Sequence, residues 1–216
     1  MPVTLLSRVQ HRTWFLSALA TMALAAGLFS LTLFYTEESS AVEARYSLRP
    51  LIAAGLKDQS GNRIKAADLK DKLVLVNFFF TSCGSACPLQ TSTLRDIQQQ
   101  LDSSVDVLFL SVSIAPLLDN RQAISQYIEK FELPQSRWKF ATASVSETEK
   151  LISQFGVTLE NAVTAKGTTE DQIDHRNTGF LFAKNGTMMQ QYQLQPSVSK
   201  RLAREITELN GLFTAQ

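Results

Sequence analysis

The longest apolar stretch of the chain that carries no charge lies near the N-terminus, from Trp14 to Tyr35. A helix of this length, at about 1.5 Å per residue, spans roughly 33 Å, which is enough to cross the hydrocarbon core of a bilayer. Arg8 and Arg12 precede the stretch, so the positive-inside rule predicts that residues 1–13 are cytoplasmic and that the rest of the chain is exported. We therefore expect one transmembrane anchor over residues 14–35.

A cleaved signal peptide is the competing interpretation of this segment. Val42-Glu43-Ala44 is an acceptable small-residue cleavage site, but it lies well beyond an apolar stretch that is longer than a usual signal core. An uncleaved anchor in the inner (cytoplasmic) membrane, with a soluble domain on the periplasmic or other extracytoplasmic side, fits the lengths better. Residues 36–49 are polar and acidic in their first part and read as a tether. Residues 50–216 remain, and they are enough to bury a core.

Apolar and polar positions beyond the tether follow the two periods that are typical of strands and helices. Leu73–Phe80 is a near-continuous apolar run, as expected for a strand that is buried on both faces, and 105–112 is a second. The predicted elements are a turn at 60–62 between two short strands, strand 73–80, helix 88–101, strand 105–112, helix 121–131, strand 138–142, helix 144–155, a hairpin of 178–183 with 187–192 around Asn185-Gly186, and a final helix capped by Ser197.

This alternation of strands and helices predicts a mostly parallel sheet with helices on both faces, to which the closing hairpin adds antiparallel strands. We interpret the pattern as an α/β domain with a thioredoxin-like fold. Ligands of such sheets gather at the carboxyl ends of the strands. The segment that begins with Cys83 directly follows the carboxyl end of the first central strand.

Cys83 and Cys87 are the only cysteines of the chain, and they lie between a buried strand and the start of a helix. A helix N-terminus favours the thiolate, which is the form that attacks disulfides and binds metals. A spacing of four places both sulfurs on one side of the turn and leaves more room between them than a C-x-x-C pair does. We predict a redox or metal site here. A structural disulfide is the alternative, but closing so short a loop contributes little stabilisation.

His175 is the second candidate, because the other histidine, His11, belongs to the predicted cytoplasmic segment. A lone histidine in a loop is usually just solvated. However, His175 precedes the strand that faces the cysteine loop in this fold. Two thiolates and one imidazole suit Cu(I) and can also hold Cu(II), while a zinc site with an open position is an alternative. The cis proline of thioredoxin-type reductases has no counterpart in residues 156–177, which favours a metal site.

Several short stretches of the chain match a known family pattern: Val76–Cys83 with Cys87-Pro88, Ser111–Ser113 with Pro116 and Asp119, Lys130–Trp138, Phe155–Val157, and Asp174-His175 with Gly179-Phe180. In these stretches the chain resembles the Sco/SenC family, the copper-handling thioredoxin-fold proteins of cytochrome oxidase assembly. This resemblance spans about residues 50 to 210. It implies copper binding through Cys83, Cys87 and His175, and delivery of copper or of reducing equivalents to the dinuclear copper site of an oxidase subunit.

Two departures from the family pattern make this chain a divergent member. Gly84-Ser85 stand where the family usually has Pro-Asp after the first cysteine, and Ala115 stands where the family has an aspartate before Pro116. An acidic group close to a metal site tunes the affinity for the metal, so these departures bear on the copper chemistry. The client of this protein therefore need not be the usual oxidase.

Three functions are carried forward from the sequence. The first is an exported metallochaperone that binds a copper ion and hands it to an oxidase subunit or another exported cuproprotein. The second is a membrane-tethered thiol–disulfide oxidoreductase in which Cys83 and Cys87 are catalytic, and the third is a redox sensor or binding module. Peroxide reduction is disfavoured, because the proline upstream of Thr81 in such relatives is absent. A net charge of +1 without a long basic run gives no footprint for nucleic acid.

Overall fold

The computed structural model describes residues 47–82, 86–157 and 177–214, together with Met22 and Ala26. The chain divides into two units, Met1–Ala44 and Arg45–Gln216, and the second is the α/β domain. The predicted cytoplasmic segment, most of the tether and, apart from Met22 and Ala26, the predicted membrane span lie outside the described residues. Over the described ranges, no helix combines the length and the apolar composition that crossing a membrane would require.

A six-stranded sheet forms the centre of the domain, with the strand order β1-β4-β3-β2-β5-β6. The strands β2, β3 and β4 are parallel, whereas β1, β5 and β6 pair antiparallel with their neighbours. The predicted parallel central strands and closing hairpin are confirmed. The sheet as a whole is mixed rather than mostly parallel, because three of its five strand pairs are antiparallel. The strands are β1 (Lys57–Asp58), β2 (Leu73–Phe79), β3 (Val107–Ser113), β4 (Trp138–Thr142), β5 (Thr178–Phe182) and β6 (Met188–Gln193).

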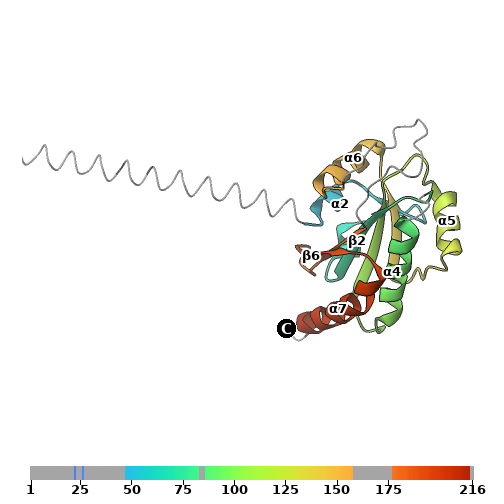
Figure 1. Cartoon of the computed structure of the whole chain (residues 1–216). Coiled ribbons are helices and arrows are strands. Elements are labelled where there is room, and N and C mark those ends of the chain that lie inside the picture. The colour runs from blue at the N-terminus through green and yellow to red at the C-terminus, as the bar shows by residue number, and fades with distance from the viewer. Residues whose placement is uncertain (1–21, 23–25, 27–46, 83–85, 158–176, 215–216) are drawn as a thin grey trace, which may run out of the picture. The chain divides into compact units, whose positions relative to one another are not determined.

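Helices cover both faces of this sheet (Figure 1). From β2 to β4 the chain steps across the sheet in one direction through right-handed crossovers, so α4 and α5 lie on the same face, where α7 packs against α4. The return from β4 to β5 runs the opposite way and places α6 on the other face, beside α2. The helices are α2 (Arg49–Ala53), α3 (Ala66–Leu69), α4 (Ala86–Gln100), α5 (Arg121–Lys130), α6 (Val145–Gln154) and α7 (Ser199–Thr214).

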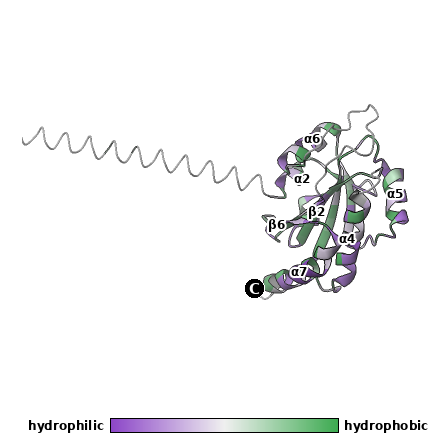
Figure 2. Cartoon of the chain, viewed as in Figure 1, coloured by the Kyte–Doolittle hydropathy of each residue, from purple (hydrophilic) through white to green (hydrophobic). Residues whose placement is uncertain are grey.

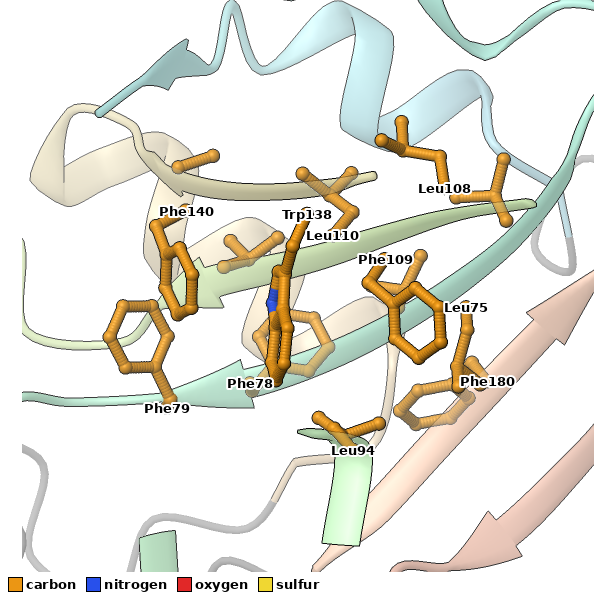
Figure 3. Packing of buried hydrophobic residues seen from close by; sticks show 14 of the residues in the cluster. Leu75, Phe78, Phe79, Leu94, Leu108, Phe109, Leu110, Trp138, Phe140 and Phe180 are labelled. Carbon is orange, nitrogen blue, oxygen red and sulfur yellow. The ribbon is translucent and has the colours of Figure 1, made fainter. Parts of the chain in front are cut away.

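Strand β2 is buried along its whole length because helices cover both of its faces. Its successive side chains point to opposite sides. Phe78 packs against Phe155 and Phe180 with ring centroids 5.2 and 6.1 Å away, whereas Phe79 packs against Tyr127 at 5.5 Å (Figure 3). The hydropathy colouring shows the same arrangement, with apolar strands inside and polar outer faces on the helices (Figure 2). The buried core extends to Phe80, one residue beyond the end of β2.

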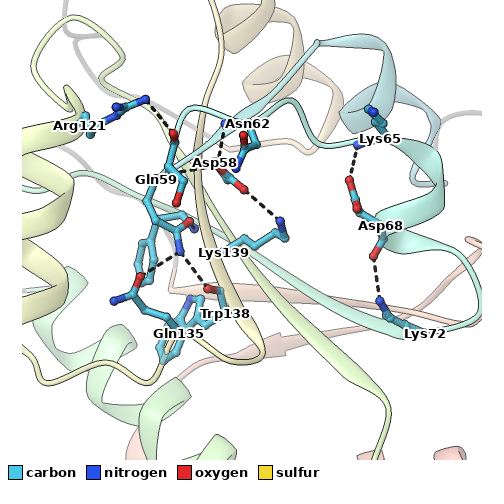
Figure 4. Close-up of polar contacts among 12 residues, drawn as sticks. Asp58, Gln59, Asn62, Lys65, Asp68, Lys72, Arg121, Gln135, Trp138 and Lys139 are labelled. Atoms are coloured by element: carbon cyan, nitrogen blue, oxygen red, sulfur yellow. Dashed lines mark hydrogen bonds and ion pairs between the residues drawn. The ribbon is translucent and has the colours of Figure 1, made fainter.

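The turn predicted at Ser60-Gly61-Asn62 fastens β1 to the edge of the sheet (Figure 4). The Asp58 carboxylate accepts hydrogen bonds from the backbone N–H groups of Ser60 and Asn62 at 3.0 and 2.9 Å, and from Lys139 Nζ on β4 at 3.0 Å. Burial raises the pKa of Asp58, but the hydrogen bond from Lys139 and those from the two backbone groups outweigh it and hold the pKa below its usual value. The short edge strand is therefore tied to the sheet by a charged contact.

The helix ends agree with the sequence prediction at α6 but not at α7. The Ser144 hydroxyl accepts a hydrogen bond from Glu147 N at 3.3 Å, and Gly156 has a φ of +64° after the last turn, as the capping pattern predicts. Ser197 is not the cap of α7, so that prediction was wrong. It lies inside a 3-10 turn, η2 (Pro196–Val198), because the fixed φ of Pro196 starts that turn first.

Candidate functional site

The segment with the two cysteines leaves the sheet where β2 and β3 end together. Phe79 is paired with Ser113, and the Ile114 N–H donates to the Phe79 carbonyl at 2.9 Å. Thr81 and Ser82 form the turn that follows, and Cys87 belongs to the first turn of α4, which begins at Ala86. The cysteines therefore belong to the stretch between a buried strand end and a helix start, as the sequence predicts.

The segment that carries His175 returns to the sheet beside the same strand. Strand β5 is antiparallel to β2, with Gly179 opposite Asn77 and Phe182 opposite Val74. Because of this direction, the chain before Thr178 comes from the carboxyl end of β2. The backbone carbonyl of Asn177 also accepts a hydrogen bond from Leu194 N, next to the end of β6. The described part of the chain thus joins the sheet two residues after His175.

Gly179 lies against Leu194, the residue after β6. A Cβ at this position would lie 3.0 to 3.2 Å from the side-chain carbons of Leu194, which is tighter than ordinary packing. Shifting β5 by one residue along β6 would bring a larger side chain, Phe180 or Thr178, against Leu194. This contact therefore favours the observed register of β5 on β6.

Cys83 and His175 lie outside the described residues, and so does the side chain of Cys87. The distances among the three predicted ligands therefore remain predictions. Within the described ranges, no group of three histidine, cysteine, aspartate or glutamate side chains is close enough together to hold a metal ion. Thiolate and imidazole are ligands that suit copper, so the chemistry of the predicted set fits the ion that the sequence implies.

A chain of buried polar side chains links the sheet to the helix that begins at the cysteines. Trp138 Nε1 donates to Ser111 Oγ at 2.9 Å, and Ser111 Oγ donates to Asn77 Oδ1 at 2.6 Å. Asn77 Nδ2 then donates to Gln90 Oε1 at 2.9 Å. All four side chains are almost completely buried. Gln90 follows Cys87 by three residues, so this network fixes the start of α4 against β2.

A second polar cluster surrounds the carboxylate of Asp119, in the loop between β3 and α5. Oδ1 accepts hydrogen bonds from the backbone N–H and the hydroxyl of Thr81, at 2.9 and 2.6 Å. Oδ2 accepts one from the Ser113 hydroxyl at 2.5 Å. Burial raises the pKa of Asp119, and the hydrogen bonds from Ser113 and Thr81 offset only part of this rise. The cluster joins the end of β3 to the residue two positions before Cys83.

Sequence reasoning did not assign a role to Asn77, Gln90 or Asp119, although Asn77 and Asp119 belong to the stretches that match the Sco/SenC pattern. A polar residue inside a run such as LVLVNFFF is the signal that could have found Asn77. A buried polar group needs a hydrogen-bond partner, so its position in a strand predicts a buried polar network.

The model of the SCO1/SenC family matches residues 55–210, which is most of the α/β domain. The chain belongs to the SCO1/SenC family. Curated relatives agree with this assignment. A SCO1 protein homolog of Bacillus subtilis is 28% identical over 137 residues, which cover 63% of this chain and 69% of that protein. A SCO2-like protein of Rickettsia prowazekii is 26% identical over 155 residues, 71% of this chain and 72% of the relative.

Solved structures of the SCO1/SenC family have the same fold. A SCO1/SenC family lipoprotein from Bacillus anthracis superposes with a TM-score of 0.62 at 25% identity, over 71% of this chain and 90% of that one. BsSco, a member of the Sco family of cytochrome c oxidase assembly proteins, gives 0.59 at 22% identity, over 73% and 91%. ScoI of Bradyrhizobium japonicum, solved with copper bound, gives 0.58 at 20% identity, over 70% and 95%. The predicted thioredoxin-like α/β domain is therefore confirmed.

Proposed function

We propose that this SCO1/SenC protein is an exported, membrane-anchored chaperone that binds one copper ion through Cys83, Cys87 and His175 and delivers it to a respiratory cuproprotein such as cytochrome c oxidase. The observation that supports this most directly is the register of β5 on β2, with Gly179 opposite Asn77. Cys83 follows Asn77 by six residues and His175 precedes Gly179 by four, so both chains extend from the same end of one strand pair. Six or fewer residues, at about 3.3–3.6 Å each, are long enough to bring their side chains together.

Copper titration of the reduced full-length protein in detergent tests the ligand set. With a chromophoric Cu(I) competitor, we expect one copper per chain. Loss of a group that only orients a ligand typically weakens metal binding roughly 10- to 100-fold, so we expect His175→Ala, which removes a ligand, to cost more. His11→Ala changes the only other histidine and is the matched control. Absence of stoichiometric copper in the wild-type protein would refute the proposal, and a normal affinity in His175→Ala would remove that ligand.

The membrane anchor is a separate part of the proposal and rests on residues 14–35. An uncharged stretch of this length, preceded by Arg8 and Arg12, supports an anchor with an exported domain. We expect the protein to remain with the membrane fraction after an alkaline carbonate wash. Complete release into the supernatant would contradict the anchor without touching the copper site.

A thiol–disulfide oxidoreductase is the second candidate, because Cys87 lies in the first turn of α4, where the helix dipole favours a thiolate. In that reaction the Cys83 thiolate attacks a disulfide of the partner and releases one partner thiolate. The Cys87 thiolate then attacks Cys83 in the mixed disulfide, which releases the second partner thiolate and leaves a Cys83–Cys87 disulfide. An exported dithiol reductant then reduces the Cys83–Cys87 disulfide and is itself oxidised to a disulfide. If the protein is a reductase, His175→Ala should reduce the partner's disulfide at a nearly normal rate. If it delivers copper, His175→Ala should lose copper transfer.

A further inference from the structure

The carboxylate of Asp119 is the most deeply buried charged group that the structure describes near the cysteines. Its residue is 1% exposed, and none of the three ion pairs found among the described residues includes it. Carboxylates are almost never fully buried without a compensating partner. In place of a cation, Asp119 has three short hydrogen bonds, two of them from Thr81. A residue that costs folding free energy in this way is expected to serve a local purpose.

Hydrogen bonds from two other residues reach both oxygens of the Asp119 carboxyl group. The Thr81 N–H can only donate, and its bond to Oδ1 is 2.9 Å long. The Ser113 hydroxyl oxygen already accepts from the Ala115 N–H at 3.0 Å, so its proton is directed to Oδ2. A neutral amide in place of the carboxyl group would put an N–H group toward Ser113, so the Ser113 hydroxyl would have to accept there instead of donating. Both oxygens of Asp119 are therefore held by the groups of Thr81 and Ser113.

These contacts span two strand ends. Ser113 is the last residue of β3, and Thr81 lies two residues beyond the end of β2. Both the backbone and the side chain of Thr81 are held, so its position and its orientation are fixed relative to β3. Cys83 follows after one intervening residue, Ser82. The placement of Thr81 therefore sets the start of the segment that carries the first predicted copper ligand.

We propose that Asp119 is a positioning residue of the copper site, which acts through Thr81 to restrict where the Cys83 sulfur can lie. This inference rests on the proposed function, because it assigns a purpose to the clamp made of Asp119, Thr81 and Ser113. Binding sites need their ligands held to within about 0.5 Å of the productive geometry, and the fixed position of Thr81 limits the reach of a residue two positions further along the chain. Loosening the clamp would spread the sulfur over more positions and weaken its joint action with Cys87.

Thr81 offers the sharpest test, because two substitutions there separate the hydroxyl from the shape of the side chain. Thr81→Val keeps the size and removes the hydroxyl donor, whereas Thr81→Ser keeps the donor. We expect Thr81→Val to weaken Cu(I) binding roughly 10-fold, as the loss of a group that orients a ligand typically does, and Thr81→Ser to retain most of the affinity. Asp119→Asn should resemble Thr81→Val. Ser92→Ala, which removes a hydroxyl bonded to the Leu89 carbonyl on the exposed face of α4, is the control.

A second measurement needs no copper and therefore separates this inference from the proposed function. The equilibrium between the reduced dithiol and the Cys83–Cys87 disulfide is measured against a glutathione buffer, with the full-length protein in detergent. Because a loosened loop lowers the effective concentration of one thiol near the other, we expect Thr81→Val to lower the equilibrium constant for disulfide formation several-fold, on the order of the copper effect. As a third measurement, this time with copper bound, the Cu(II) absorption and paramagnetic spectra of Thr81→Val should differ from those of the wild type.

These measurements distinguish a failure of the proposed function from a failure of the positioning role. If the wild-type protein binds no copper but the dithiol equilibrium responds to Thr81→Val and not to Thr81→Ser, the proposed function fails, and the clamp positions Cys83 for dithiol chemistry instead of copper binding. If Thr81→Val changes thermal stability while copper affinity, spectra and dithiol equilibrium all match the wild type, the clamp serves only the fold and the inference is overturned. Near-ultraviolet circular dichroism checks that each variant is folded. Should Asp119→Asn fail to fold, the pair of substitutions at Thr81 decides alone.

Discussion

Replacing Ser111 by alanine should destabilise the domain far more than the loss of one hydroxyl suggests. The Ser111 hydroxyl is the middle of the buried network, where it accepts from Trp138 Nε1 at 2.9 Å and donates to Asn77 Oδ1 at 2.6 Å. Ser111→Ala would leave that donor and that acceptor buried without partners. Each such group costs about 1–3 kcal/mol, so the two together cost about 2–6 kcal/mol. Whole domains have a free energy of unfolding of only about 5–15 kcal/mol.

Urea denaturation of the full-length protein in detergent, followed by far-ultraviolet circular dichroism, measures this cost. Ser92→Ala is the control, because its hydroxyl is exposed on α4, and it should change the free energy of unfolding by no more than about 0.5 kcal/mol. Adding Trp138→Phe to Ser111→Ala removes the orphaned donor, so the double variant should cost less than the two single changes added together. If Ser111→Ala costs no more than Ser92→Ala, the hydroxyl does not bridge the two groups and the network as described is wrong.

Two further outcomes follow from buried ionisable groups. The pKa of Asp119 is higher in the folded protein than its ordinary value of 3.8, so folding favours the protonated carboxyl. We compare the free energy of unfolding of the wild type with that of Asp119→Asn. The difference, wild type minus variant, should fall as the pH rises from below 3.8 through the folded pKa, and should level off above it. Urea titrations at several pH values measure this difference, and a constant difference would contradict the prediction. Tyr192→Phe removes a 2.6 Å hydrogen bond from the phenol to Glu205 Oε1. It should lower the free energy of unfolding by about 0.5–1.5 kcal/mol, which thermal denaturation detects as a lower melting temperature. Glu205→Gln keeps an acceptor for the phenol and should lower the melting temperature less.

The central strands could be predicted from the sequence because strands that are buried on both faces consist of long apolar runs. Every residue of β2 and β3 is buried, and both strands were expected within two residues of their observed ends. Helices α2 and α3 were missed, since five and four residues are too few to show a helical period. Their place is decided by tertiary packing of a few apolar side chains, such as Leu51.

For the candidate site, the sequence predicts the residues that carry the chemistry but not the contacts that position them. The sequence identifies Cys83, Cys87 and His175 as chemistry-bearing residues, because few other residue types bind copper or exchange disulfides. It does not predict the clamp on Thr81, because the contact with Asp119 joins residues 38 positions apart and depends on the direction of two side chains. Nor does it reveal that Gln90 meets Asn77, since a glutamine in a helix is ordinarily solvent-facing.

The position of Gly179 has a consequence for how this chain tolerates a change in length. Gly179 is paired with Asn77, and a side chain at position 179 would press on Leu194, so β2 and β6 together set where the chain returns to the sheet. Lengthening a connection between two paired strands costs little closure entropy. Insertions placed before Asp174 should therefore leave the strand pairing and the fold unchanged, whereas a single residue added between His175 and Gly179 would shift the histidine along the strand direction by about 3.3 Å.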